Sequence, residues 1–128
     1  MTIHVLVADD EPHIGRIIQT KLEQGPFRVT LVSDGPAALS ALEEYPDIAL
    51  VLLDVMMPGL TGLEVLARIR ADARWSALPC MILTAGGHEQ HREEAFKLNV
   101  DDFLTKPFSP KRLFARVAEL TATAPGVS

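Results

Sequence analysis

An apolar run from Ile48 to Leu53 constrains this chain more than any other stretch, because it ends directly in a carboxylate, Asp54. A run of this length that contains valine and isoleucine and is followed by turn residues, here Pro58 and Gly59, is typical of a strand buried on both faces of a parallel sheet. Asp54 would then lie at the carboxyl end of that strand, the edge where ligands bind in open α/β sheets. The stretch alone fits equally an aspartate that caps the following turn.

The rest of the chain alternates between strand patterns and helix patterns. Strands are predicted over 3–8, 28–33, 48–53, 80–84 and 101–105, and a stretch with helical spacing follows each of them. Such alternation with short connections predicts one parallel sheet of five strands covered by five helices on its two faces. The chain is about half as long as a closed eight-stranded barrel requires.

Apolar spacing predicts which side of each helix faces the sheet. In the first helix, which begins at Pro12 and stops before Gly25, these residues are Ile14, Ile17, Ile18 and Leu22. Thr61 is the expected cap of the third helix. The inward side of that helix is predicted to comprise Gly62, Val65, Leu66, Ile69 and Ala73.

Length and charge narrow the class of protein. At 128 residues the chain fits one domain, expected over 1–121, with 122–128 as a C-terminal tail or the start of a linker. Its formal net charge of -5 argues against direct nucleic-acid binding, which requires clustered lysine and arginine. No apolar run approaches the ~20 residues that a bilayer requires, so we expect a cytoplasmic protein without membrane contact. The single cysteine, Cys80, is expected to be a buried structural thiol.

Five chemically active side chains follow predicted strands. The carboxyl ends of parallel strands share one edge of the sheet, so Asp9, Asp10, Asp54, Thr84 and Lys106 are expected to meet there. Clustered carboxylates repel one another, and a hard divalent cation relieves that repulsion. The oxygen donors favour Mg²⁺, bound by Asp9, Asp10 and Asp54.

An aspartate beside Mg²⁺ can act as a nucleophile toward a phosphoryl donor. Asp54 is the best placed of the three aspartates, and the Lys106 ammonium and Thr84 hydroxyl can each contact a phosphoryl oxygen. The Lys106-Pro107 bond is a candidate cis peptide that would direct the ammonium back toward the pocket.

Four stretches of the chain contain these residues: Val7-Ala8-Asp9-Asp10-Glu11, Leu53-Asp54-Val55-Met56-Met57-Pro58-Gly59, Leu83-Thr84-Ala85 and Asp101-Asp102-Phe103-Leu104-Thr105-Lys106-Pro107-Phe108. Together they resemble the receiver domain of bacterial two-component response regulators. The resemblance implies a flavodoxin-like fold, a three-layer sandwich with strand order 2-1-3-4-5. It also implies transfer of a phosphoryl group to Asp54 from a histidine kinase or a phosphotransfer protein.

The resemblance further implies roles for single residues. Asp10 would bind Mg²⁺ directly, Asp9 through water, and Met56 through its backbone carbonyl. On phosphorylation the Thr84 hydroxyl would move to the phosphoryl group and Phe103 would swing inward. The face formed by the fourth helix, fifth strand and fifth helix would then change, and with it the contact with an output domain, a downstream partner or a second copy.

Some positions depart from the family pattern. Phe103 stands where many members carry tyrosine, so no hydroxyl is present to hold an inward ring. Asn99 is expected at a helix C-terminus, where asparagine tolerates the left-handed conformation. Lys97 and Arg112 occupy positions where members with winged-helix outputs usually carry acids that form dimer salt bridges, which argues against that dimer.

Two hypotheses concern residues around the site and the output face. Met56 and Gly86 each follow a site residue by two positions, and we expect them to flank the path of the attacking water, with Met56 crowding it. Phe96 and Phe114 are expected to meet on the output face, which is the face formed by the fourth helix, fifth strand and fifth helix. There they would form the apolar centre of a partner or dimer patch. His88 and His91 are interpreted as solvated helix residues rather than metal ligands.

The predicted function is that of a phosphoaccepting signalling switch whose only chemistry is its own phosphorylation and dephosphorylation, and which is therefore not an enzyme. One alternative is a Mg²⁺-dependent aspartyl-phosphate phosphohydrolase, but Asp54 lacks a second acid two residues later. The other is a non-phosphorylated pseudo-receiver that serves as an interaction module, although every chemically required residue is present.

Overall fold

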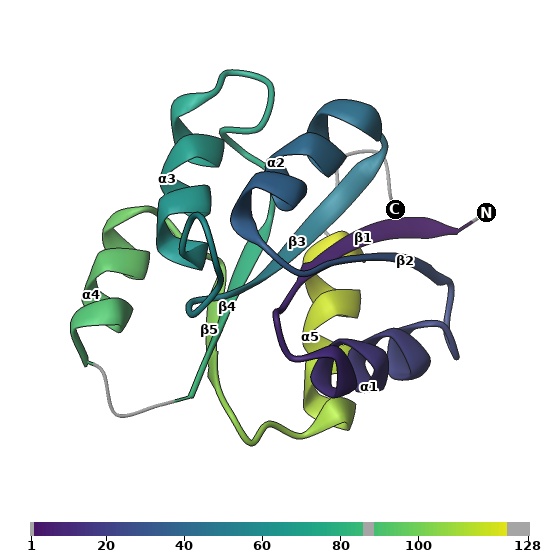
Figure 1. Ribbon diagram of the computed structural model, residues 1–128. Coiled ribbons are helices and arrows are strands. Elements are labelled where there is room, and N and C mark those ends of the chain that lie inside the picture. The colour runs from purple at the N-terminus through teal and green to yellow at the C-terminus, as the bar shows by residue number, and fades with distance from the viewer. Residues whose placement is uncertain (1, 86–88, 123–128) are drawn as a thin grey trace.

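The computed structural model describes residues 2–85 and 89–122, where five strands alternate with five helices (Figure 1). The strands are β1 (Ile3–Ala8), β2 (Phe27–Val32), β3 (Ile48–Asp54), β4 (Cys80–Thr84) and β5 (Asp102–Thr105). The helices are α1 (Pro12–Leu22), α2 (Gly35–Glu44), α3 (Gly62–Ala71), α4 (Glu89–Lys97) and α5 (Pro110–Ala122). All strand pairs are parallel, and their order, β2-β1-β3-β4-β5, confirms the predicted topology.

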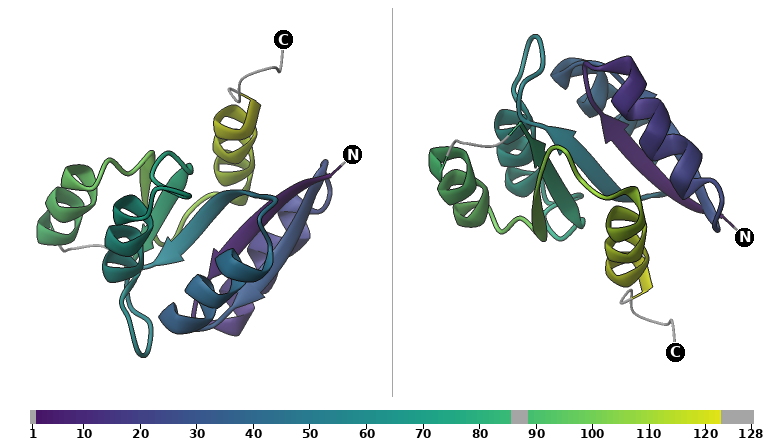
Figure 2. Two further views of the ribbon diagram at one scale, coloured as in Figure 1. Left: turned by 90° about the horizontal axis from the view of Figure 1, so that it is seen from above. Right: turned by 90° about the horizontal axis from the view of Figure 1, so that it is seen from below.

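The sheet is the middle of three layers, with α1 and α5 on one face and α2, α3 and α4 on the other (Figures 1 and 2). Alternate residues of β3 point into the two cores: Leu50 and Leu52 toward α1 and α5, Val51 and Leu53 toward the other three helices. All four side chains have no exposed surface. The prediction that this strand is buried on both faces is therefore confirmed.

Two of the predicted inward positions are wrong. Ile17 is 45% exposed, because Gly15, Ile18 and Leu22 form the side of α1 that faces the sheet. Ile17 lies one residue before Ile18, a turn of about 100° around the helix axis, which places it at the edge of that side. Ala73 lies outside α3 and is exposed, because the helix ends at Ala71.

Local signals at helix ends are confirmed. Thr61 and Glu64 form a reciprocal capping box at the start of α3, with each side chain accepting a hydrogen bond from the other residue's backbone N–H. Asn99 follows α4 with φ of 58°, the left-handed conformation expected there. Cys80 is fully buried, as predicted, and burial raises the pKa of its thiol to about 12.

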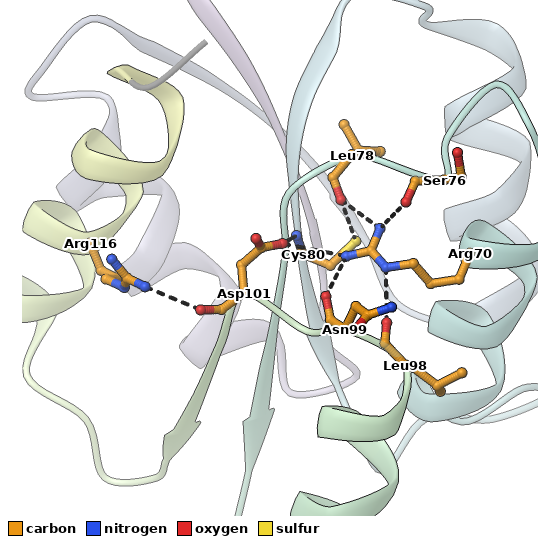
Figure 3. A network of polar contacts seen from close by, with 8 residues as sticks. All are labelled: Arg70, Ser76, Leu78, Cys80, Leu98, Asn99, Asp101 and Arg116. Carbon is orange, nitrogen blue, oxygen red and sulfur yellow. Dashed lines mark hydrogen bonds and ion pairs between the residues drawn. The ribbon is translucent and has the colours of Figure 1, made fainter.

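A network centred on Arg70 closes the edge of the sheet opposite the carboxyl ends of the strands (Figure 3). The Arg70 guanidinium, carried by α3, donates to the carbonyl oxygens of Leu98 at 2.9 Å and Asn99 at 3.0 Å, after α4. It also donates to those of Leu78 at 2.7 Å and Ser76 at 3.3 Å, before β4. One side chain thus ties α3 to the end of α4 and to the loop that enters β4.

The helix α5 includes Ala122, while 123–128, where the tail was expected, lie outside the described residues, so the domain boundary stays a prediction. Within 2–85 and 89–122, none of the helices combines the length and the apolar character needed to cross a membrane.

Candidate functional site

The residues predicted to meet at the carboxyl ends of the strands, here called the rim residues, do lie together: Asp9, Asp10, Asp54, Thr84 and Lys106. Asp9 follows β1, Asp54 ends β3, Thr84 ends β4 and Lys106 follows β5. Asp9, Asp54 and Thr84 are buried, whereas Asp10 is exposed at the mouth of the site. These positions result from the parallel register, in which Asp54 pairs with Leu83 and Thr84 with Thr105.

Lys106 is the centre of the charge arrangement. Its Nζ lies 2.8 Å from Glu11 Oε1, 3.0 Å from Asp9 Oδ2 and 3.3 Å from Asp54 Oδ2. Its backbone N–H donates to the Thr84 carbonyl oxygen at 2.6 Å, which fixes the chain beyond β5 to the end of β4. The Lys106-Pro107 peptide bond is cis. The ammonium therefore lies among carboxylates from two segments of the chain, the one that follows β1 and the end of β3.

Burial and neighbouring charges shift the pKa values of both Asp54 and Lys106. Burial, followed by the charge of Asp9, raises the pKa of Asp54 to about 7, although Lys106 opposes that shift. Burial disfavours the charged form of Lys106, but its contacts with Glu11 and Asp9 and the charge of Asp54 outweigh this and raise the pKa of Lys106 above its ordinary range. The ammonium stays charged, while the protein by itself does not keep Asp54 fully ionised near neutral pH.

The acidic side chains fit a divalent cation. Oxygen atoms of Asp9, Asp10, Glu11 and Asp54 lie within 4.8 Å of one another. Asp9 Oδ2 is buried and accepts no hydrogen bond within the described residues, although Lys106 is near enough to form an ion pair. A buried carboxylate oxygen without a donor, among further hard oxygen atoms, matches the preference of Mg²⁺.

Glu11 belongs to this group and was not among the predicted site residues. The sequence held a signal for it, because Glu11 directly follows Asp9 and Asp10 after β1. Its contact with Lys106 joins positions 95 residues apart, and no local pattern reveals such a contact.

The segment between β3 and α3 holds Asp54 in place. The N–H of Val55 donates to the Leu83 carbonyl at 3.0 Å, and the N–H of Gly62 donates to the Val55 carbonyl at 3.0 Å. A β-carbon at Gly62 would overlap the carbonyl oxygen of Asp54, so only glycine fits there. The Met56 N–H lies 3.4 Å from Asp54 Oδ1, and its side chain is 62% exposed beside the rim. The metal-binding role of the Met56 carbonyl stays a prediction.

Phe103 lies on β5, paired with Ile82 of β4. Its ring is partly buried and packs against the core between the sheet and α2, α3 and α4. It also lines a pocket of about 290 Å³ together with Phe108, Arg112 and Leu113. Phe103 thus borders both the core and the surface near α5, although its predicted movement stays a prediction.

The prediction that Phe96 and Phe114 meet is wrong. The Phe114 ring packs edge-on against Phe27 of β2, with ring centroids 5.5 Å apart, and belongs to the core on the α1 and α5 face. Phe96 is 51% exposed on α4, which covers the opposite face of the sheet near its other edge (Figure 1). Helical spacing placed each ring next to the residues of its helix that face the sheet, but it could not show that the sheet lies between Phe96 and Phe114.

Other predictions concern residues of α4, of the segment before it and of α5. Gly86 and His88 lie outside the described residues. His91 is half-buried on α4 and lines a groove of about 450 Å³ between α3 and α4 that also includes Met56. Lys97 and Arg112 are both exposed.

Known proteins resemble this chain in sequence and in fold. Residues 5–118 match the family described as the response regulator receiver domain. The phosphate regulon transcriptional regulatory protein PhoB of Klebsiella pneumoniae is 38% identical over 118 residues, which are 91% of this chain and 51% of PhoB. The transcriptional regulatory protein ResD of Bacillus subtilis is 39% identical over 121 residues, which are 94% of this chain and 48% of ResD.

The chain therefore spans about half the length of these curated relatives. Among solved structures, the receiver domain of Francisella response regulator 1452 has a TM-score of 0.85 and 35% identity, and the match covers 94% of this chain and 97% of that one.

Proposed function

The chain belongs to the response regulator receiver domain family, and from that premise we propose that Asp54 accepts a phosphoryl group and thereby switches the domain between two states. The observation that supports this most directly is the position of the Lys106 ammonium, 3.3 Å from the buried Asp54 carboxylate at the carboxyl edge of the sheet. A fixed cation beside a buried carboxylate is the arrangement that stabilises charge on a transferred phosphoryl group.

In the proposed reaction, an oxygen of the ionised Asp54 carboxylate attacks the phosphorus of the donor. An O–P bond forms, the bond between phosphorus and the leaving group breaks, and its electron pair departs with the leaving group. The product is an acyl phosphate on Asp54. Lys106 neutralises an equatorial phosphoryl oxygen, and the Thr84 hydroxyl donates to another.

Asp9, Asp10 and Asp54 would hold Mg²⁺, with the Met56 carbonyl as a further ligand. When bound, the ion supplies the positive charge that keeps Asp54 ionised and that offsets charge on the phosphoryl oxygens. This role follows from the donor set, because Asp54 otherwise has a pKa of about 7, and the carboxylates of the rim repel one another.

The switch would act through Thr84 and Phe103, on β4 and β5. Phosphoryl oxygens on Asp54 would offer the Thr84 hydroxyl new acceptors, and Phe103 would then turn toward the position that Thr84 leaves. We propose that this changes the face formed by α4, β5 and α5. Through it, the domain would control an output domain, a downstream partner or a homodimer, while a histidine kinase or phosphotransfer protein supplies the phosphoryl group.

The two alternative functions find less support. A phosphohydrolase of the aspartyl-phosphate type would use a second acid two residues after Asp54, and the residue there is Met56, whose side chain is exposed. A pseudo-receiver would not require the convergence of Lys106 with Asp9 and Asp54. Receiver domains are signalling switches, and we propose that this one has no substrate beyond its own aspartate.

Incubation with acetyl phosphate and Mg²⁺, followed by intact-protein mass spectrometry, tests this function. We expect one phosphoryl group on the wild-type protein, none on Asp54→Asn, and none on the wild type when a chelator removes Mg²⁺. Phosphorylation of Asp54→Asn to the same level would place the acceptor elsewhere. Continuous release of inorganic phosphate from unrelated phosphate esters would favour the phosphohydrolase, and no phosphorylation of the wild type would favour the pseudo-receiver.

A further inference from the structure

Lys106 has more carboxylate partners than phosphoryl transfer requires. An ammonium group has three N–H donors, and three carboxylates lie within 3.3 Å of Lys106 Nζ, those of Glu11, Asp9 and Asp54. The nearest is Glu11 Oε1, at 2.8 Å. In this state Lys106 donates hydrogen bonds to Glu11 and Asp54 and forms an ion pair with Asp9. A phosphoryl oxygen would therefore have to displace one of these carboxylates.

The backbone of Glu11 directs its side chain to this position. Glu11 is the N-cap of α1, where a side chain commonly accepts a hydrogen bond from the first turn, but the Glu11 side chain accepts none from the helix. The Glu11 N–H instead donates to Asp9 Oδ1 at 2.9 Å, and its carbonyl accepts from the N–H groups of Ile14 and Gly15. The backbone is thus fixed to Asp9 and to the helix, while the carboxylate extends to Lys106.

Of the three carboxylates, that of Glu11 can leave most easily. The Glu11 side chain is 48% exposed, whereas those of Asp9 and Asp54 are 0% and 4% exposed. A carboxylate that swings into water regains its hydration, and the strand ends do not hold it as they hold the two aspartates.

We propose that Glu11 is a positioning residue that holds the Lys106 ammonium in the unphosphorylated protein and competes for it with the incoming phosphoryl group. This inference rests on the proposed function, and it adds a brake on phosphorylation that is released when Glu11 turns to solvent. The step itself is unchanged: Asp54 oxygen bonds to phosphorus, and acetate leaves with the electron pair when acetyl phosphate is the donor.

The experiment compares initial rates of phosphorylation by acetyl phosphate at saturating Mg²⁺. Glu11→Gln removes the competing charge at nearly constant shape, so we expect a rate about two- to fivefold above the wild type, the range that follows from the strength of a partly exposed ion pair. Glu44→Gln, the same change at an exposed position at the end of α2, should leave the rate at the wild-type value.

A second variant separates contact from charge. Glu11→Asp keeps the net charge but has a shorter side chain, and an aspartate at an N-cap tends to bond to the helix N–H groups instead. We expect its rate to lie between those of the wild type and Glu11→Gln. A Glu11→Asp rate equal to the wild type, beside a raised Glu11→Gln rate, would assign the effect to charge alone and overturn the competition for Lys106.

The third measurement is the Mg²⁺ dissociation constant of each variant, obtained from thermal shifts. Glu11 also lies among the candidate metal ligands, and a weakening of about tenfold in Glu11→Gln would assign it to the metal instead. An unchanged constant with a raised rate supports the inference. If the wild type is phosphorylated and the rate for Glu11→Gln is equal or lower, the inference about Glu11 is wrong while the proposed function stands. If the wild type takes up no phosphoryl group, both are wrong.

Discussion

At the scale of single residues, the site requires a glycine, Gly62, as well as its charged side chains. Gly62 begins α3 directly against the carbonyl of Asp54. Backbone atoms cannot move aside as a flexible side chain can, so the close approach of α3 to the end of β3 requires glycine at this position.

We therefore expect Gly62→Ala to lower the free energy of unfolding by about 2–3 kcal/mol, the upper part of the range for overpacking, because the overlap is with backbone atoms. Urea denaturation measures this directly. Gly15→Ala is the matched control, because a β-carbon there would lie 3.4 Å from the Leu31 side chain, an ordinary contact. Its expected effect is a gain of about 0.5–1 kcal/mol from helix propensity, and equal losses in the two variants would contradict the overlap at Gly62.

At the scale of secondary-structure elements, the two ends of the sheet are built differently. The carboxyl end holds like charges close together, whereas at the opposite end Arg70 forms an ion pair with Asp101 at 3.4 Å in addition to its bonds to backbone carbonyls (Figure 3). Asp101 extends this network, because its carboxylate accepts from the Cys80 N–H at 2.8 Å and its carbonyl accepts from Arg116 of α5 at 3.1 Å. The network therefore joins the ends of α3 and α4 to the middle of α5, at the edge of the sheet away from the acidic site.

Arg70→Lys tests how much this junction contributes. Lysine keeps the charge but has neither the planar fork nor the number of donors, so carbonyl oxygens at Leu78 and Leu98 would lose partners. We expect a loss of about 2–3 kcal/mol in the free energy of unfolding. Arg68→Lys, the same substitution on the exposed side of α3, should change it by less than about 0.5 kcal/mol; similar losses in both would show that the network contributes little.

At the scale of the whole molecule, stability and chemistry are linked through the charge of the rim. The folded protein raises the pKa of Asp54 from its ordinary 3.8 to about 7. Between these values the folded state holds a proton that the unfolded chain has released. The contribution of Asp54 to the free energy of unfolding therefore falls as pH rises from about 4 to 7, in the absence of metal.

Asp54→Asn has no such proton and should lack this fall. With a chelator present, we expect the variant to become more stable than the wild type by about 1–3 kcal/mol at pH 8, and by much less at pH 5. Thermal unfolding across this range measures the difference. Added Mg²⁺ should then stabilise the wild type more than the variant, because it binds the charged carboxylates; a difference that does not depend on pH would contradict the link.

Much of the site followed from sequence because it is built at strand ends. Asp54, Asp9 and Lys106 each stand next to a recognisable strand, and parallel pairing brings such positions to one edge whatever the loops do. The capping box at Thr61 and the left-handed Asn99 were also predictable, since both depend on backbone chemistry within a few residues.

Other features depended on which surfaces face each other in three dimensions. The sheet separates Phe96 from Phe114, the side of α1 that faces the sheet leaves Ile17 exposed, and Lys106 meets Glu11 across 95 residues. The sequence by itself determined the elements, their order and the aspartates at the edge, because these follow from periodicity and local backbone preferences. Only the tertiary structure decided which carboxylate is nearest to Lys106, because helix rotation and side-chain direction are set by packing between elements.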